Sequence, residues 1–162
     1  QVVHLDDALG LAVLRPDVAL SPLGVVTFQT GIPRLQTSVA VAGFPYGGVL
    51  VTPSLTFGRL ADMRGLNGEE TIKRLALTAQ SGDAGGPVFD NAGSVLGMLL
   101  PRNESGGQVL PQDVSFSVDS DEILASLNTA GIAAQTTDAV AFMSPETLTL
   151  RAADNTVLVS CW

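Results

Sequence analysis

The chain has 162 residues, of which 46% are hydrophobic and 15% charged, and its formal net charge is −8. This length and apolar content predict one globular domain and exclude a disordered chain. The acidic balance argues against nucleic acid or an anionic membrane surface as a partner, and no apolar run reaches the roughly 18 residues of a membrane-spanning helix.

The chain begins with strand patterns. Residues 2–5 have the apolar pattern of a strand, and residues 11–14 (Leu-Ala-Val-Leu) form a short apolar run that an Arg-Pro pair ends. Residues 16–24 contain two prolines and predict a loop, and residues 25–28 predict another short strand. We expect sequence upstream of Gln1, because the chain starts inside a strand pattern without an initiating methionine.

The central part predicts a series of short strands separated by turns. After the first strand, the segment Phe44 to Gly48 reads as a turn, because its proline fixes φ and its glycines permit positive φ. The pair Asn67-Gly68 is a strong hairpin signal, and residues 90–93 form a further turn. The strands expected here are residues 38–42, 49–57, 59–63, 71–78, 88–89, 95–100 and 113–118.

The C-terminal part predicts one helix and a hairpin. Residues 120–131 begin with capping residues, carry three apolar residues on one helical face and end in glycine. Residues 132–146 predict a loop, and residues 147–151 and 156–162 alternate around a four-residue turn, which predicts a terminal β-hairpin. Strands that arrive every 8–12 residues with one late helix predict an all-β sandwich or closed barrel.

The loop at residues 82–87 carries a family resemblance. Its sequence, Gly-Asp-Ala-Gly-Gly-Pro, resembles Gly-Asp-Ser-Gly-Gly-Pro, the nucleophile segment of the trypsin-like serine peptidases, with alanine in place of serine. Residues 93–97 resemble the strand turn that follows in the bacterial Deg-type branch of that family. Residues 11–15 resemble the strand after the catalytic aspartate, and residues 39–47 resemble the start of the second barrel.

This resemblance implies an all-β, trypsin-like double β-barrel with a complete second barrel, a partial first barrel and one late helix. The implied divisions are residues 1–34 (end of the first barrel and crossing linker), 35–130 (second barrel and helix) and 131–162 (C-terminal extension with the terminal hairpin). A partial barrel has open edges, which proteins normally cover. Residues 147–162 could cover one edge; alternatively, a missing N-terminal fragment completes the barrel, tied through Cys161, the only cysteine. The simpler reading is that this cysteine is a free thiol.

The chemistry of the loop can be stated from its residues. Acyl transfer needs a nucleophile beside two N–H donors that bind the developing oxyanion. The resemblance assigns these donors to the backbone of Gly82 and Ala84, which does not depend on a serine hydroxyl. Ala84 stands at the nucleophile position and has no atom that can attack a carbonyl, and Ser81 and Ser94 do not lie at the elbow. Asp83 is expected to accept local backbone hydrogen bonds.

The other triad positions also depart from the family. The family's aspartate stands directly before the Leu-Ala-Val-Leu strand, where this chain has Gly10. Asp6 or Asp7 could replace it only if the alignment slips, and the one histidine, His4, does not match the family's histidine motif. Because losing one triad group already removes most activity, two departures favour natural loss of catalysis over an engineered substitution.

Substrate contacts are implied only by the resemblance. Thr78, six residues before the nucleophile position, matches the floor of the specificity pocket and implies a small, neutral pocket. Ser81 is assigned to the same substrate-binding region. Val114, Ser115 and Phe116 match the strand that pairs with the substrate backbone, so a peptide could add as an extra strand. Ordinary barrel packing explains these residues equally well.

The sequence therefore predicts a catalytically inactive trypsin-like serine peptidase homologue, a pseudopeptidase that binds peptide or protein. Metal-ligand clusters and phosphate-binding loops are absent from the sequence, so no cofactor is expected. The alternative is an active serine endopeptidase represented by a truncated or Ser-to-Ala inactivated chain, and a third reading is a structural domain without a binding role. The resemblance implies a periplasmic or secreted protein.

Overall fold

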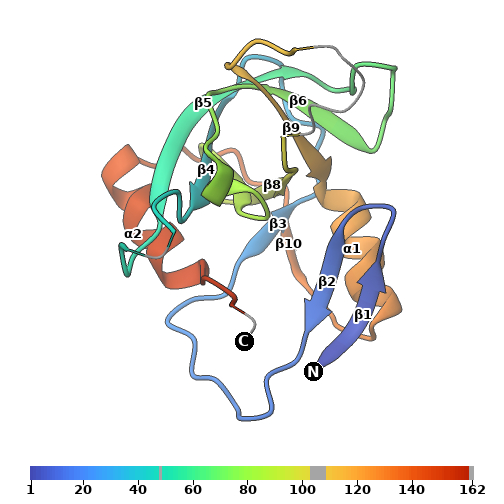
Figure 1. Ribbon diagram of the computed structural model, residues 1–162, viewed down its shortest axis with the longest axis vertical. Helices are drawn as coiled ribbons and strands as arrows, with labels where there is room; N and C mark the ends of the chain where they lie inside the picture. The colour runs from blue at the N-terminus through green and yellow to red at the C-terminus, as the bar shows by residue number, and fades with distance from the viewer. Residues whose placement is uncertain (48, 103–108, 161–162) are drawn as a thin grey trace.

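The central feature of the fold is a closed barrel of six strands (Figure 1). The computed structural model describes residues 1–47, 49–102 and 109–160. All neighbouring strands of the barrel are antiparallel, and the pairing of β8 with β9 closes the ring. A complete second barrel is thereby confirmed. In spatial order its strands are β7 (Pro87–Asp90), β4 (Ser38–Gly43), β5 (Ser54–Asp62), β6 (Ile72–Ala76), β9 (Val114–Asp119) and β8 (Val95–Leu99).

The two faces of β4 explain how the barrel is packed. Val39 and Val41 belong to one buried cluster, and Ala40 and Ala42, which alternate with them, belong to a second. The first cluster comprises Val39, Val41, Leu60, Leu75, Leu77, Val88, Leu96 and Leu99, and it fills the barrel. Each such side chain contributes about 1.5–3 kcal/mol when fully buried.

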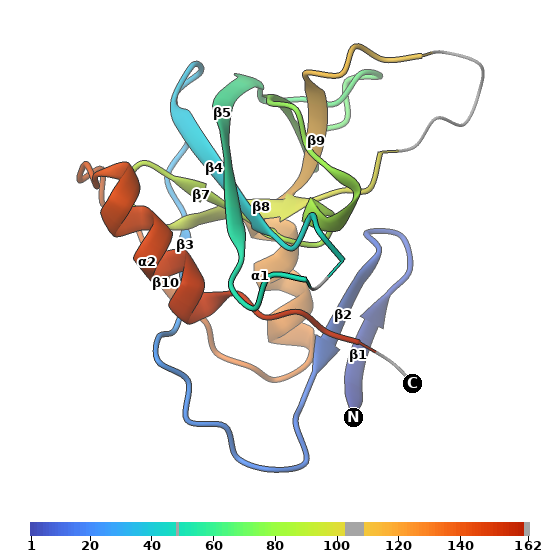
Figure 2. The ribbon, with the colours of Figure 1, turned by 60° about the vertical axis from the view of Figure 1, so that its left-hand side comes forward.

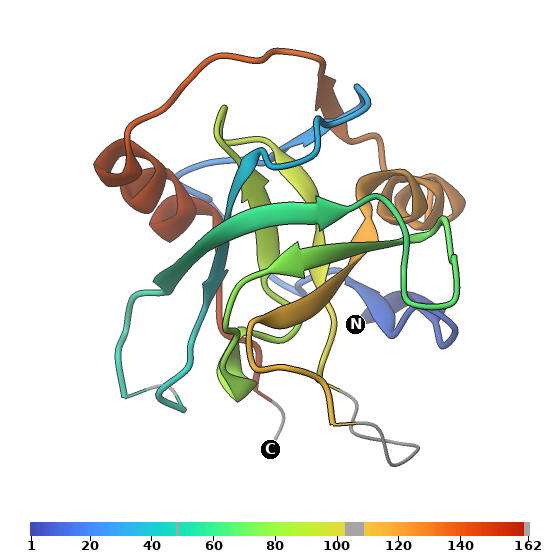
Figure 3. The ribbon, with the colours of Figure 1, turned by 90° about the horizontal axis from the view of Figure 1, so that it is seen from above.

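The second cluster joins the outer face of the barrel to the helices. It contains Ala40 and Ala42 together with Leu148 and Ala152 of α2 (Pro145–Asn155) and Ile123 of α1 (Ser120–Thr129). Small alanines on β4 leave room for helical side chains on the outside of the sheet. Viewed from above, α1 and α2 lie on opposite sides of the barrel (Figure 3).

The predicted terminal hairpin is wrong, because residues 145–155 form α2 and residues 156–160 lie in no strand. The Ser144 side chain caps the helix by accepting a hydrogen bond from the Thr147 N–H at 3.3 Å, and proline stands at the first helical position. Leu148 and Ala152, four residues apart, are both buried. The fold therefore has two helices where one was predicted. Cys161 lies outside the described residues.

Outside the barrel, β1 (Val2–Asp6) and β2 (Leu11–Leu14) form a separate antiparallel hairpin beside α1 (Figure 2). β3 (Thr27–Gln29) and β10 (Gln135–Thr137) pair in parallel and extend the sheet next to β8. β10 lies in a range predicted as a loop.

The predicted helix at residues 120–131 is confirmed in α1, and Gly131 follows it with φ of +70°. The strand expected from residue 49 begins only at Ser54. Within the described residues, neither helix is long and apolar enough to cross a membrane.

Candidate functional site

The loop that resembles a nucleophile segment has a defined backbone geometry. A 3-10 turn, η1 (Ser81–Asp83), is followed by Ala84 at φ −60° and ψ 136° and by Gly85 at φ +81°. The Gly86 N–H donates to the Asp83 carbonyl at 3.0 Å, which closes a type II turn with glycine where positive φ is required. Ala84 stands at the exposed corner of this turn.

Two further glycines in the loop are required by close backbone contacts. A Cβ on Gly82 would lie 2.2 Å from the Phe44 carbonyl oxygen, and a Cβ on Gly86 would lie 2.1 Å from the Ala42 carbonyl oxygen. The Phe44 N–H also donates to the Gly82 carbonyl at 2.9 Å. The loop is therefore held tightly against the end of β4, and only glycine fits at these two positions.

A buried carboxylate holds the loop from the inside. Asp83 has 0% exposure, and its Oδ2 accepts hydrogen bonds from the Gln80 N–H at 2.9 Å and the Thr56 hydroxyl at 3.3 Å. The expected local backbone hydrogen bond is confirmed by the Gln80 contact. Asp83 Oδ1 has no hydrogen-bond partner within the described chain.

The two predicted oxyanion donors are the backbone N–H groups of Gly82 and Ala84. Gly82 lies within the 3-10 turn η1, and Ala84 directly follows the last residue of that turn. Both groups belong to the tight loop described above. Their use as an oxyanion hole stays a prediction.

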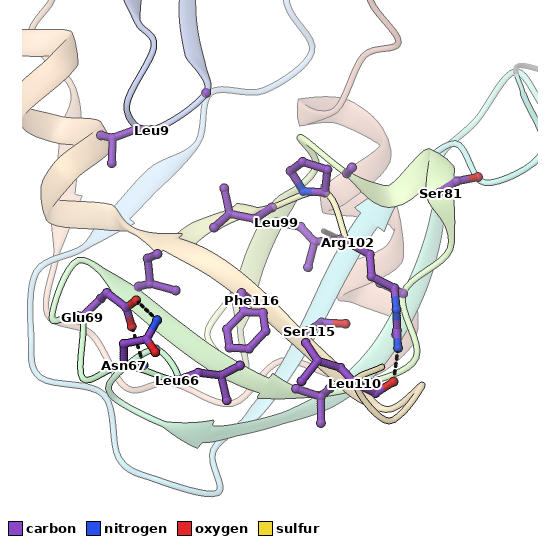
Figure 4. Close-up of a pocket in the computed structure, with 18 of the residues that line it drawn as sticks. Leu9, Leu66, Asn67, Glu69, Ser81, Leu99, Arg102, Leu110, Ser115 and Phe116 are labelled. Carbon is purple, nitrogen blue, oxygen red and sulfur yellow. Dashed lines mark hydrogen bonds between the residues drawn. The ribbon is translucent and has the colours of Figure 1, made fainter. Parts of the chain in front are cut away.

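A cavity of about 640 Å³ lies beside Ala84 (Figure 4). Segments far apart in the chain line it: the tip of the β1–β2 hairpin, the β5–β6 turn, the nucleophile loop, the end of β8 and the start of β9. The predicted site residues that it brings together are Gly10, Ser81, Ala84, Val114, Ser115 and Phe116. Thr78 is exposed and does not line it, so its assignment to the pocket floor stays a prediction.

Gly10, which the resemblance places at the family's aspartate, has an unusual backbone conformation. It follows the turn of the β1–β2 hairpin with φ of +64°, in the left-handed region that side chains other than glycine rarely adopt. A Cβ placed there would meet nothing within 4 Å. An aspartate at this position would therefore have space and would carry only the strain of the left-handed conformation, which aspartate tolerates better than most residues.

The two nearby aspartates do not replace the missing group. Asp6 Oδ1 accepts hydrogen bonds from the N–H groups of Ala8 and Leu9, each at 3.1 Å, and so caps the hairpin turn. Asp7 is exposed and does not line the cavity.

Among the described residues, no histidine lines the cavity beside Ala84. His4 is in β1, opposite Val13. The Ser115 hydroxyl is buried and donates to the Leu77 carbonyl at 3.0 Å, and Ser94 is buried in the β7–β8 turn. Ser81 is the exposed serine on the cavity wall, three residues before the nucleophile position.

The sequence prediction missed several lining residues. Leu66, Asn67 and Glu69 come from the β5–β6 turn, Leu99 ends β8, and Leu100 to Arg102 follow it. The only sequence signal for the second group was the proline that ends the apolar run at residue 100. The first group carries a turn signal but nothing that indicates a cavity.

The charged side chains at the cavity are held by neighbouring groups. Glu69 accepts hydrogen bonds from the Asn67 side-chain amide at 2.8 Å and the Asn67 N–H at 2.9 Å. These hydrogen bonds, the side-chain amide first, lower the pKa of Glu69. The Arg102 guanidinium donates to the carbonyls of Leu110, Pro111 and Gln112. Over the described residues, no group of three or more His, Cys, Asp or Glu could hold a metal ion.

Known proteins resemble this chain in sequence and in fold. An uncharacterised Sinorhizobium fredii protein, y4bJ, is 27% identical over 99% of this chain, which spans only 26% of that protein. The inactive Ser-to-Ala mutant of Rv3671c from Mycobacterium tuberculosis superposes with a TM-score of 0.61 and 25% identity, over 81% of this chain and 64% of that one. The serine endoprotease from Yersinia pestis superposes with a TM-score of 0.64 and 19% identity, over 80% and 43% of the two chains.

The family described as "Trypsin-like peptidase domain" matches residues 1–98. That range is more than half of the chain, and it includes the β1–β2 hairpin, the crossing linker and the nucleophile loop. The chain belongs to the trypsin-like peptidase domain family.

Proposed function

We propose that this chain is a catalytically inactive trypsin-like peptidase homologue that binds a peptide or protein segment in the cavity beside Ala84. The observation that carries this proposal is the combination of an ordered nucleophile loop with alanine at its corner and a left-handed Gly10 on the same cavity. Loss of the serine or the histidine alone lowers kcat of such an enzyme by about 10⁶-fold. Hydrolysis by the family's mechanism is therefore not expected.

The backbone around the cavity supports peptide binding. The Leu100 N–H donates to the Phe116 carbonyl at 2.8 Å, and within the described chain no hydrogen bond to the Leu100 carbonyl is recorded. Leu100 follows the last residue of β8 and lines the cavity. An extended peptide can donate an N–H to this carbonyl and add to the sheet at this point.

Restoring the nucleophile tests the inactive assignment. We expect the Ala84→Ser variant of the full-length protein to show no turnover of casein and no labelling by a fluorophosphonate probe. The reason is that glycine stands at the position that the resemblance assigns to the aspartate, and His4 does not line the cavity. The unchanged protein is the control. Turnover by Ala84→Ser would refute natural loss and favour the alternative, an active endopeptidase whose serine has been replaced.

We further propose membership of the Deg-type branch and a periplasmic or secreted location. The support is the resemblance of residues 93–97 to that branch. Fractionation of cells that express the full-length protein tests the location, and recovery in the cytoplasmic fraction alone would contradict it.

A further inference from the structure

The inner surface of the cavity is largely apolar. Leu66, Leu110 and Phe116 project toward it from three different segments (Figure 4). Leu9 adds a further aliphatic side chain from the hairpin tip. An apolar guest would bury this surface together with its own, which favours binding.

The two charged groups at the cavity are engaged with neighbouring neutral groups. Both Glu69 carboxylate oxygens accept hydrogen bonds from Asn67, and the Arg102 guanidinium donates to the carbonyls that precede β9. A lysine or aspartate side chain placed against the leucine and phenylalanine lining would lose its hydration, and these apolar side chains offer no hydrogen bond in return.

The cavity is larger than a pocket that holds one side chain. About 640 Å³ lies in the range of sites that enclose ligands of many heavy atoms. Leu100 lines the cavity, and its carbonyl can accept a hydrogen bond from the N–H of a polypeptide backbone. A purely aliphatic small molecule would leave this carbonyl without a partner.

We propose that the cavity selects an extended polypeptide segment through two or more uncharged, apolar side chains and rejects segments with charged side chains at those places. This inference rests on the proposed function, since it names the class of peptide that the site binds. Specificity comes from the leucine and phenylalanine lining, and affinity also draws on the Leu100 carbonyl.

Fluorescence anisotropy with the full-length protein tests the inference. The probes are labelled eight-residue peptides of serine and glycine that carry two leucines, one leucine, two aspartates or two lysines near the centre. We expect the two-leucine peptide to bind at least tenfold more tightly than either charged peptide, with the one-leucine peptide between them.

Two leucine variants test the place of binding. Leu66 is 51% exposed and lines the cavity, so Leu66→Asp should fold and should weaken binding of the two-leucine peptide at least tenfold. Leu150 is 70% exposed on α2 and does not line the cavity, so Leu150→Asp is the matched control and should bind normally.

The outcomes separate this inference from the proposed function. If no peptide binds, both fail. If charged and apolar peptides bind equally, or if the two leucine variants lose affinity equally, apolar selection by this cavity is overturned while peptide binding stands.

Discussion

The nucleophile loop and the tip of the β1–β2 hairpin line the same cavity, but they differ in how tightly their backbones are packed. The loop keeps its backbone conformation, with Gly82 and Gly86 packed on β4 and Asp83 buried beneath. The hairpin tip carries Gly10 in a left-handed conformation with open space around it. A serine would restore the family's pattern at the loop, whereas an aspartate at the tip would also have to overcome the backbone. Close backbone contacts constrain the loop, whereas the hairpin tip has open space around Gly10.

The largest expected effect comes from adding one methyl group at each place. Gly86→Ala should lower the free energy of unfolding by at least about 3 kcal/mol, since the new Cβ would overlap the Ala42 carbonyl oxygen. Gly10→Ala should cost only about 1–2 kcal/mol, the strain of a left-handed alanine. Urea denaturation of both variants measures the difference. Equal losses would show that the loop is no more constrained than the hairpin.

The next two variants remove one carboxylate from the nucleophile loop and one from the β1–β2 hairpin. Asp83→Ala removes a fully buried carboxylate that accepts a hydrogen bond from the Gln80 N–H, and should cost about 2 kcal/mol. Asp6→Ala removes the cap of a turn whose freed N–H groups can bind water, and should cost about 1 kcal/mol.

Hydrogen exchange shows where each of these carboxylate variants acts. We expect faster exchange in the nucleophile loop for Asp83→Ala and in the hairpin alone for Asp6→Ala. Faster exchange of the loop in Asp6→Ala would contradict the independence of the two places.

The smallest expected effect is the pH dependence of the β5–β6 turn at the cavity. Hydrogen bonds lower the pKa of Glu69 below its ordinary value of 4.5. Because the folded-state pKa is lowered, the stabilising contribution is complete above about pH 4.5 and is lost as pH falls through the folded pKa. The NMR signal of the Asn67 side-chain amide should shift in that acidic window, and Glu69→Gln should abolish the shift. A shift centred above pH 4.5 would contradict the direction.

The terminal segment shows where sequence reasoning went wrong. The alternation of residues 147–151 resembles a strand, yet Leu148 and Ala152 are also four residues apart, as on one face of a helix. Ser144 and Pro145 carried the helix-start signal. The buried outer face of β4, which receives α2, could not be read from local alternation.

The sequence by itself determined the features that depend on short-range constraints. Glycine spacing defined the nucleophile loop, Ala84 removed its nucleophile, and alternating valines and leucines marked the barrel strands. These are properties of a few adjacent residues, so they are visible without the fold.

Only the tertiary structure decided which distant segments meet. β3 and β10 pair although more than a hundred residues separate them, and the cavity joins Leu9, Leu66 and Phe116 from three parts of the chain. Such contacts depend on sheet closure and helix docking, in which burial of apolar surface over the whole domain outweighs local preference. The alanine at residue 84 can therefore be read from the sequence alone, whereas the apolar cavity beside it exists only in the folded chain.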